Sequence, residues 1–220
     1  MRLGYEPVFD PRDDDASLAG AADVSAPILG IDPGLSRCGY GAIMRTGATA
    51  RAVAAGVIRT DAQLALPLRL ARLHDEIEAL LDDLVPRAVV VERVLFQVNA
   101  RTAIAVGQAS GIALAAAARR QIPVVQYSPN EVKLAISGDG AADKRAVQLM
   151  VTKLLRLPVA PEPPDAADAL ALALCHAWRD RVERAIAGTA GVVAGDQDPG
   201  TRVASRLQAR IDAALARGRA

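Results

Sequence analysis

The sequence has few cysteines, few aromatic residues and no long hydrophobic run. Two cysteines, Cys38 and Cys175, occur in 220 residues, and neither has a partner at the spacing of a zinc-ligand pair. A disulfide framework and a zinc finger are therefore not expected. No apolar run reaches the roughly 18 residues that a membrane span needs, and the acidic N-terminus is unlike a secretory signal. We expect a cytoplasmic protein with buried free thiols and no membrane partner.

The net charge of +1 hides an uneven distribution along the chain. Residues 1–26 contain six acids, two bases and few large apolar groups, which predicts a disordered acidic extension. Residues 27–187 have the length of one domain and contain nineteen bases and sixteen acids, an excess compatible with a phosphate-bearing partner. Residues 188–220 combine a Gly/Asp linker with arginines and apolar residues four apart, which predicts a flexible linker and a basic amphipathic tail.

The apolar pattern predicts strands and helices in alternation. Short apolar runs predict strands, and leucine or alanine residues at helical spacing predict helices. The expected strands cover 28–32, 39–44, 51–60, 88–92 and 123–127, and the expected helices cover 64–84, 99–120, 130–136, 142–157 and 165–186. This order predicts an α/β fold in which a five-stranded mixed sheet carries helices on both faces.

Four acids stand at the ends of these elements. Asp32 ends the first strand and Glu92 the fourth, while Asp165 and Asp168 open the last helix three residues apart, on one helical face. Singly, each has an ordinary role as a turn residue, a strand-end charge or an acid that favours the helix dipole. Together they predict a metal site, because clustered carboxylates repel one another unless a cation lies among them. Oxygen ligands favour Mg²⁺ or Mn²⁺ over zinc.

Five motifs, in this order, resemble the RuvC family of Holliday-junction resolvases. They are Ile31-Asp32-Pro33-Gly34, Val89 to Val94, Gly107 to Gly111, Tyr127 to Lys133, and Asp165 to Leu170. The resemblance implies a ribonuclease-H-like fold and a homodimeric, magnesium-dependent crossover junction endodeoxyribonuclease that acts on four-way junction DNA in recombination and repair. It also implies branch-migration motor proteins as partners.

The resemblance further implies catalytic roles. Asp32, Glu92, Asp165 and Asp168 match the family's four catalytic acids, which hold two Mg²⁺ ions, with Mn²⁺ able to substitute. Such a site would nick two opposed strands of the junction symmetrically, leaving a 5′ phosphate and a 3′ hydroxyl at each nick. Lys133 and Lys144 match lysines near the scissile phosphate, where positive charge stabilises the transition state. Their ordinary alternative is a pair of solvated helix lysines.

Four further residues match the family's DNA contacts. Asn99 and Arg101 match the loop-to-helix segment that approaches the junction centre, and their ordinary alternative is a helix cap with a surface charge. The family commonly has an aromatic residue three positions after the catalytic Glu, where it stacks on an unpaired base. Here Leu95 holds that position and Phe96 follows it, so the sequence leaves open which of the two meets the bases.

Two other functions compete with this interpretation. A phosphotransferase of the actin and sugar-kinase type also begins with a strand that runs into an Asp-Gly turn. It would need a second phosphate-binding loop and a second domain of similar size, which 220 residues do not supply. The other is a junction-binding scaffold without cleavage, which the loss of one acid would favour. All four acids are present.

Overall fold

The computed structural model describes residues 6–7, 26–93 and 100–190. The chain divides into a unit of residues 1–180 and a unit of residues 181–220. In the second unit the structure describes residues 181–190, which continue the last helix. None of the helices in the described part is long and apolar enough to span a membrane.

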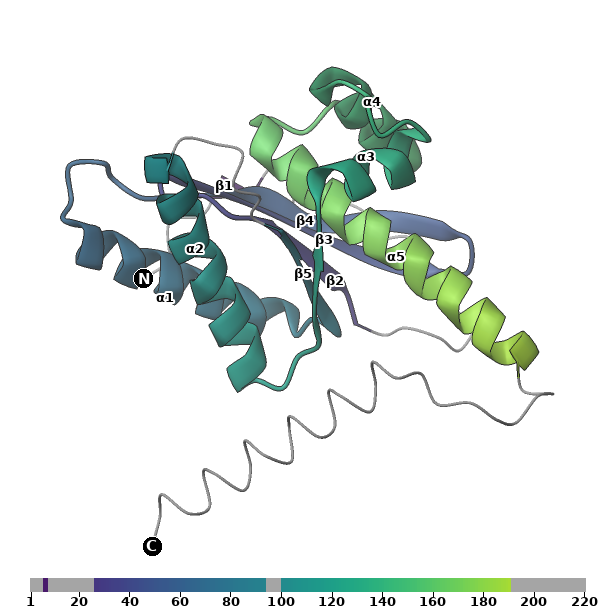
Figure 1. Ribbon diagram of the computed structural model, residues 1–220, viewed down its shortest axis with the longest axis horizontal. Helices are drawn as coiled ribbons and strands as arrows, with labels where there is room; N and C mark the ends of the chain where they lie inside the picture. Colours follow the sequence, from purple (N-terminus) through teal and green to yellow (C-terminus); the bar gives the residue numbers. More distant parts are fainter. Residues whose placement is uncertain (1–5, 8–25, 94–99, 191–220) are drawn as a thin grey trace, which may run out of the picture. The chain divides into compact units, whose positions relative to one another are not determined.

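A mixed sheet forms the centre of the first unit (Figure 1). Its strands are β1 (Glu6–Pro7), β2 (Ile28–Asp32), β3 (Arg37–Thr46), β4 (Thr49–Arg59), β5 (Ala88–Glu92) and β6 (Val124–Tyr127), in the order β1-β4-β3-β2-β5-β6. β2, β3 and β4 form an antiparallel meander, whereas β5 is parallel to both β2 and β6. This arrangement confirms the predicted mixed sheet of five strands.

The sequence did not predict β1, a sixth strand that lies within the expected acidic extension. It consists of Glu6 and Pro7, which pair with Val57 and Gly56 at the free edge of β4. Two residues are too few to show an alternating apolar pattern, so only pairing with an existing edge defines this strand. The remainder of the extension, residues 1–5 and 8–25, lies outside the described residues.

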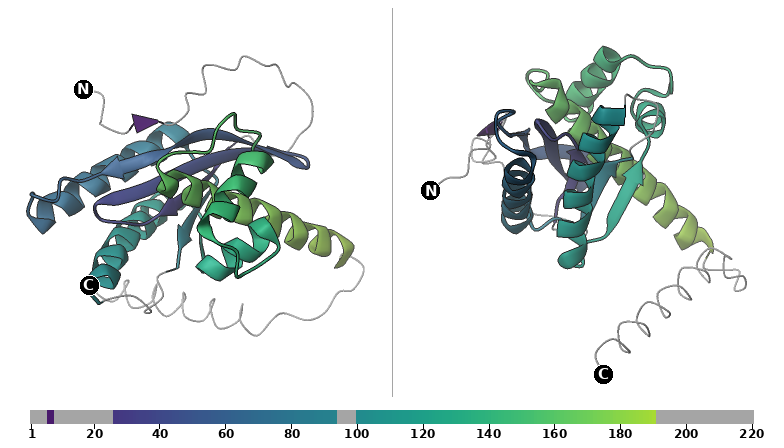
Figure 2. Two further views of the ribbon diagram at one scale, coloured as in Figure 1. Left: turned by 90° about the horizontal axis from the view of Figure 1, so that it is seen from above. Right: turned by 60° about the vertical axis from the view of Figure 1, so that its left-hand side comes forward.

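Helices cover both faces of the sheet (Figure 2). They are α1 (Leu66–Leu84), α2 (Ala100–Arg119), α3 (Pro129–Ser137), α4 (Lys144–Leu154) and α5 (Pro164–Ala190). Successive strand residues point to opposite faces, so Leu29 and Ile31 of β2 pack with α1 and α2, whereas Ile28 packs with α3, α4 and α5. The predicted α/β fold with helices on both faces is therefore confirmed.

Local capping determines where α3 and α4 begin. The Ser128 side chain accepts a hydrogen bond from the Glu131 backbone N–H, and the Glu131 carboxylate accepts one from the Ser128 backbone N–H, forming a capping box. Asp143 caps α4 by accepting a hydrogen bond from the Ala146 N–H at 2.7 Å. Each such cap stabilises a helix by about 1 kcal/mol. These caps stabilise the first turns of the two helices that carry Lys133 and Lys144.

Candidate active site

The two strand-end acids leave the sheet at the same edge. β2 and β5 are parallel neighbours, and Ile31 lies opposite Val91. Asp32 and Glu92 are the next residues on the two strands. Because Ile31 and Val91 are buried, the strand ends are anchored in the core. The sequence indicated that both strands end in an acid, and the parallel pairing brings the two acids together.

Two glycines allow α5 to lie directly against this part of the sheet. A Cβ atom built on Gly30 would lie 2.0 Å from the backbone oxygen of Ala169. One on Gly39 would lie 2.1 Å from the backbone oxygen of Asp165. Any larger residue would push the helix away from β2 and β3. The close approach places the first turn of α5, with Asp165 and Asp168, beside the ends of β2 and β5.

Asp32, Glu92 and Asp168 line a single cavity of about 290 Å³. Lys133 and Lys144 contribute two positive charges to the same cavity. The rest of its lining is mainly apolar and comprises Pro129, Val132, Val147, Ala171 and Leu172. Five of the six residues that the sequence indicated as catalytic therefore share one cavity.

The sixth, Asp165, is not among the residues that line this cavity and forms an ion pair instead. Its carboxylate accepts a hydrogen bond from the guanidinium of Arg37, the first residue of β3. The sequence pattern did not indicate Arg37 as a site residue, because Arg37 and Asp165 are separated by 128 positions. The sequence signal that could have indicated Arg37 is its position five residues after Asp32, on the strand that follows the turn.

Lys144 provides the second cation that contacts the acids. Its Nζ lies 2.7 Å from Asp168 Oδ2, and this hydrogen bond is the main reason that the pKa of Lys144 is raised. Lys144 is the first residue of α4, so it extends from the end of that helix towards the start of α5. Lys133 is partly buried in the cavity wall.

The cavity favours the protonated forms of its acids. Burial and, to a smaller extent, the negative charges of Glu92 and Asp168 together raise the pKa of Asp32 to about 7, while Lys144 opposes the shift. Burial is also the largest cause of the raised pKa of Glu92 and of Asp168. The positive charge of Lys144 alone is thus too small to balance three crowded carboxylates.

This imbalance suits a hard divalent cation, because every acid of the cavity is a carboxylate. Among the residues that the structure describes, no three Asp, Glu, His or Cys side chains converge closely enough to hold an ion as they stand. Lys144 and Arg37 hold Asp168 and Asp165 in ion pairs. The donor set fits a metal by its chemistry, and two of its four carboxylates are held in ion pairs.

A second polar network supports the helix that carries Lys133. Arg179 Nη1 donates to Glu131 Oε1 at 3.1 Å, and its guanidinium lies 5.0 Å from the centre of the Tyr127 ring. The Tyr127 hydroxyl lies 3.0 Å from His176 Nδ1. His176, which follows Asp168 by two helical turns, thus contacts Tyr127. The network ties β6, α3 and α5 together behind the cavity.

Three of the four DNA contacts indicated by the sequence cannot be placed. Leu95, Phe96 and Asn99 lie outside the described residues, which resume at Ala100. The fourth, Arg101, belongs to the first turn of α2.

Comparison with protein families gives a match over most of the chain. Residues 28–176 match the family model described as crossover junction endodeoxyribonuclease RuvC. The chain is 55% identical, over 153 residues, to the crossover junction endodeoxyribonuclease RuvC of Leifsonia xyli subsp. xyli. The aligned residues cover 69% of this chain and 74% of the relative. It is 49% identical, over 168 residues, to the RuvC protein of Rhodococcus opacus. The aligned residues cover 74% of this chain and 89% of the relative.

Solved structures give the same result. Thermus thermophilus RuvC in complex with a Holliday junction substrate is 39% identical, with a TM-score of 0.69 over 72% of this chain and 96% of that chain. The yeast mitochondrial Holliday junction resolvase Ydc2 is 14% identical, with a TM-score of 0.53 over 73% of this chain and 83% of that chain. At that identity, the similarity to the yeast enzyme concerns the fold alone.

Proposed function

The chain belongs to the RuvC family of crossover junction endodeoxyribonucleases, and we propose that it resolves four-way DNA junctions with the carboxylates of one cavity as its metal ligands. It is a nuclease and therefore a hydrolase. Its biological context is DNA recombination and repair. Family membership excludes the phosphotransferase that the sequence left open. The other alternative, a scaffold that binds the junction without cutting it, is tested by the activity measurements described below.

The metal ligands that we assign are Asp32, Glu92, Asp165 and Asp168. Nucleases of this family depend on a metal ion, and the hard carboxylate set supports two Mg²⁺ ions, with Mn²⁺ as a substitute. When bound, such ions lower the pKa of water and offset negative charge on the phosphate. Three of the ligands already line the cavity. Asp165 joins them when its ion pair with Arg37 opens.

The reaction at this site is hydrolysis of one phosphodiester bond in one strand, and a second, identical site would cut the opposed strand. Water adds to the phosphorus atom, the bond to the 3′ oxygen breaks, and that oxygen takes a proton. The products are a 5′ phosphate and a 3′ hydroxyl. Lys133 and Lys144 place positive charge at the cavity wall, where it offsets the charge that develops on the phosphate.

The observation that carries the proposal is that Asp32 and Glu92, on adjacent parallel strands, share one cavity with Asp168 and two lysines. The test uses a synthetic four-way junction and a linear duplex of the same arm sequence, each with Mg²⁺. We expect symmetric nicks in the junction and little cutting of the duplex. Asp32→Asn and Glu92→Gln should abolish cutting while junction binding stays equal or becomes tighter, because each change removes a charge that repels phosphate.

The matched control is Asp75→Asn on α1. Asp75 is an exposed acid whose side chain is 68% accessible, so this variant should cut and bind like the unmodified protein. Mg²⁺-dependent cleavage by a folded Asp32→Asn protein would overturn the ligand assignment. Absence of cleavage by the unmodified protein, with tight junction binding, would favour the scaffold.

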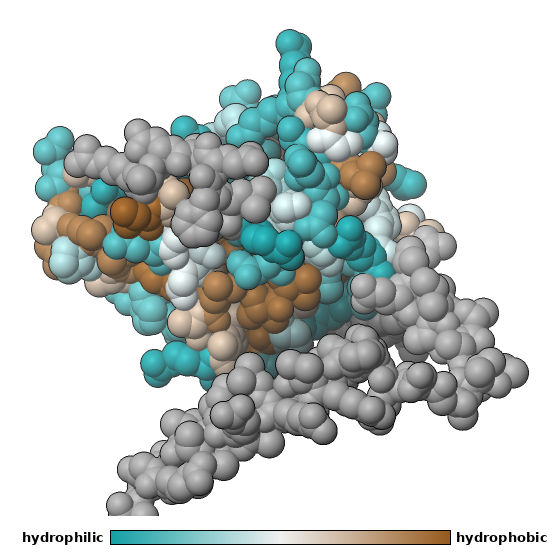
Figure 3. All heavy atoms as spheres, viewed as in Figure 1, coloured by the Kyte–Doolittle hydropathy of each residue, from teal (hydrophilic) through white to brown (hydrophobic). Residues whose placement is uncertain are grey.

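A homodimer is part of the same proposal. A four-way junction has approximate two-fold symmetry, so paired incisions need two identical sites related by a two-fold axis. α2 offers a suitable surface: Ile104 is 62% exposed, and Cβ atoms built on Gly107 and Gly111 meet no atom within 4 Å. Hydrophobic surface gathers on the side where α1 and α2 lie (Figure 3).

The dimer is tested by sedimentation at micromolar concentration, with and without junction DNA. We expect a dimer that Ile104→Glu converts to a monomer, because a charge cannot be buried at a close helix contact without a partner. Leu149→Glu is the matched control, since Leu149 of α4 is 53% exposed and lies on another helix. A monomeric unmodified protein, even with DNA, would refute this part of the proposal.

The remaining parts of the proposal come from the family resemblance and the sequence. They are junction contacts by Leu95 or Phe96, Asn99 and Arg101, and cooperation with branch-migration motor proteins. The same holds for the division into an extension of residues 1–26, a nuclease domain of residues 27–187 and a basic tail of residues 188–220. Coupled resolution by the purified protein and a motor protein would test the partnership.

A further inference from the structure

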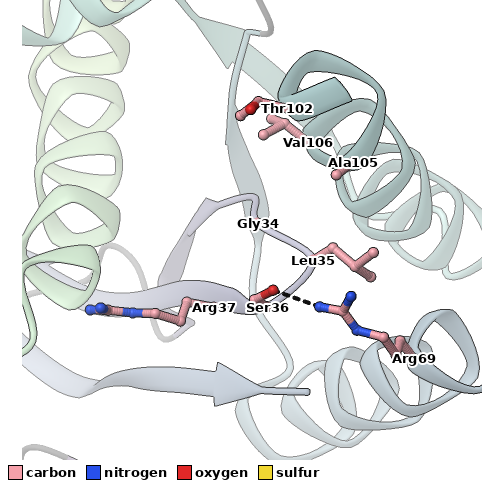
Figure 4. Close-up of a pocket in the computed structure, with 8 residues that line it drawn as sticks. All are labelled: Gly34, Leu35, Ser36, Arg37, Arg69, Thr102, Ala105 and Val106. Atoms are coloured by element: carbon pink, nitrogen blue, oxygen red, sulfur yellow. Dashed lines mark hydrogen bonds between the residues drawn. The ribbon is translucent and has the colours of Figure 1, made fainter. Parts of the chain in front are cut away.

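A second cavity lies beside the turn that follows Asp32. Its volume is about 420 Å³. The residues that line it come from the β2–β3 turn, the start of β3, α1 and α2, and are Gly34, Leu35, Ser36, Arg37, Arg69, Thr102, Ala105 and Val106 (Figure 4). We call it the turn groove. Two of its residues are arginines and none is acidic, so it is a positively charged groove.

Arg69 of α1 supplies a positive charge that the neighbouring side chains do not balance. Its Nη2 donates to Ser36 Oγ at 2.6 Å, and its Nε donates to Thr60 Oγ1 at 3.1 Å. Both acceptors are neutral hydroxyls, and among the described residues no carboxylate is recorded as its partner. A partly buried guanidinium of this kind favours an anion, and its planar set of donors matches phosphate oxygens.

Hydroxyl groups surround this charge. Ser36 and Thr102 are both exposed and line the groove from opposite walls, one on the turn and one in the first turn of α2 (Figure 4). Each hydroxyl can donate a hydrogen bond to a phosphate oxygen. The α2 helix is 20 residues long, and its N-terminal end, next to Thr102, adds a favourable electrostatic contribution for an anion.

The groove is continuous with the active site along the chain. Asp32 lines the catalytic cavity, and Gly34, two residues later, lines the turn groove. Arg37 connects the two places from the other end of the turn, since it lines the groove while its guanidinium pairs with Asp165. In Figure 4 its side chain extends away from Arg69. Phosphates repeat about every 3.4 Å along the axis of each DNA strand, so a strand held at Asp32 presents further phosphates to this turn.

We propose that the turn groove binds a backbone phosphate of the DNA strand whose neighbouring phosphate is cut at the active site, with Arg69, Ser36 and Thr102 as its contacts. The proposal rests on the proposed function, because it needs a DNA strand at Asp32. The contact is independent of base sequence and positions the strand. Cleavage chemistry itself stays with the carboxylates and lysines.

A purely structural role for Arg69 makes a different prediction. Its hydrogen bonds join α1 to the β2–β3 turn and to the end of β4, so replacing it also removes packing contacts. A structural loss lowers the melting temperature and leaves the number of released counterions unchanged. Loss of a phosphate contact lowers the slope of log K against log salt concentration by about one unit.

The first experiment measures junction affinity by fluorescence anisotropy in EDTA, where no cutting occurs, from 50 to 300 mM NaCl. Arg69→Gln should weaken binding by about tenfold at 100 mM, as expected for one charge-assisted hydrogen bond, and should lower the salt slope by about one. Arg69→Lys should keep the slope. Arg51→Gln is the matched control, because Arg51 is exposed and lies on β4 near the β3–β4 turn, whereas Arg37 pairs with Arg59 at the opposite end of the hairpin. A folded Arg69→Gln protein with unchanged affinity and slope would overturn the proposal.

The second experiment avoids the hydrogen bonds of Arg69. Thr102→Glu adds a negative charge at an exposed position of the groove, and Thr49→Glu makes the same change at the exposed start of β4. We expect Thr102→Glu alone to weaken junction binding, by tenfold or more, and to retain the melting temperature. Equal binding by both variants would overturn the proposal. So would a change in oligomeric state caused by Thr102→Glu, because the groove would then belong to a protein interface.

The two experiments remain separate from the test of the metal ligands. Binding in EDTA needs no catalysis, so the groove can fail while Asp32→Asn still abolishes cutting. Conversely, an inactive Asp32→Asn protein with a normal salt slope leaves the groove assignment standing.

Discussion

Lys144 Nζ lies 2.7 Å from Asp168 Oδ2, across the gap between the start of α4 and the first turns of α5. The hydrogen bond brings a cation into a group of carboxylates whose pKa values burial has raised. Lys144 therefore balances part of the negative charge in the absence of a metal ion. It also lines the cavity, and we propose that it contacts a phosphate bound there.

Lys144→Met should lower the rate of junction cleavage at saturating DNA and Mg²⁺ by about 10²-fold, the usual loss when one electrostatic contact to a transition state is removed. Single-turnover cleavage measures the rate, and anisotropy measures junction affinity, which should change by less than tenfold. Lys153→Met, at the exposed far end of the same helix, is the control and should cut normally. Equal cleavage rates for the two variants would show that Lys144 does not contribute to catalysis.

The raised pKa of Asp32 predicts how stability depends on pH without metal. Burial, assisted by Glu92 and Asp168, raises this pKa from 3.8 to about 7, so the folded protein retains a proton that the unfolded chain has already lost. The folded state binds more protons between these values, and the free energy of unfolding therefore falls as pH rises from about 4 to about 7. The stabilising contribution is fully present below pH 4 and is lost above about pH 7.

Urea unfolding in EDTA at several pH values measures this fall. Asp32→Asn removes one of three carboxyl groups whose pKa is raised, and it should make the fall between about pH 4 and 7 less steep. Addition of Mg²⁺ at pH 8 should raise the free energy of unfolding of the unmodified protein by binding the ionised carboxylates. Parallel profiles for the two proteins would show that Asp32 keeps an ordinary pKa.

Gly30→Ala should destabilise the fold. Its Cβ would lie 2.0 Å from the Ala169 backbone oxygen, so α5 must move away from β2, at a cost of about 1–3 kcal/mol or more. Gly140→Ala is the matched control, because an added Cβ there lies 3.8 Å from the nearest atom, the Asn130 backbone oxygen, which is an ordinary van der Waals distance. This change should alter the stability by about 0.5 kcal/mol or less. Thermal unfolding compares the two, and a Gly30→Ala protein of unchanged stability would contradict the close packing.

Either Leu95 or Phe96, shortly after Glu92, is expected to recognise the bases at the junction centre. If Leu95 enters between the bases, Leu95→Ala should lower junction cleavage, and Phe96→Ala should mainly destabilise the fold, by about 3–5 kcal/mol. If Phe96 stacks on a base, Phe96→Ala should lower junction cleavage by up to about 100-fold, since a stacked base contributes about 1–3 kcal/mol. We favour Leu95, which holds the family's position. Normal cleavage by a folded Leu95→Ala protein would count against it.

The sequence by itself determined the order of strands and helices and the residues at their ends. Apolar runs such as Val89 to Val91 indicate a buried strand, and the acid that follows the run marks the end of that strand. The leucine pattern of 64–84 likewise predicted α1. The predicted range starts at residue 64, whereas α1 begins at Leu66.

Only the tertiary structure decided which of these ends meet. The pairing of β2 with β5 joins Asp32 to Glu92 across 60 residues of sequence, and the glycines under α5 set how closely Asp168 approaches them. The partners of the charges, Arg37 with Asp165 and Arg69 with Ser36, depend on elements far apart in the chain. Periodicity reports the surroundings of one segment at a time, whereas electrostatic and hydrogen-bond contacts depend on distances that exist after the segments have packed.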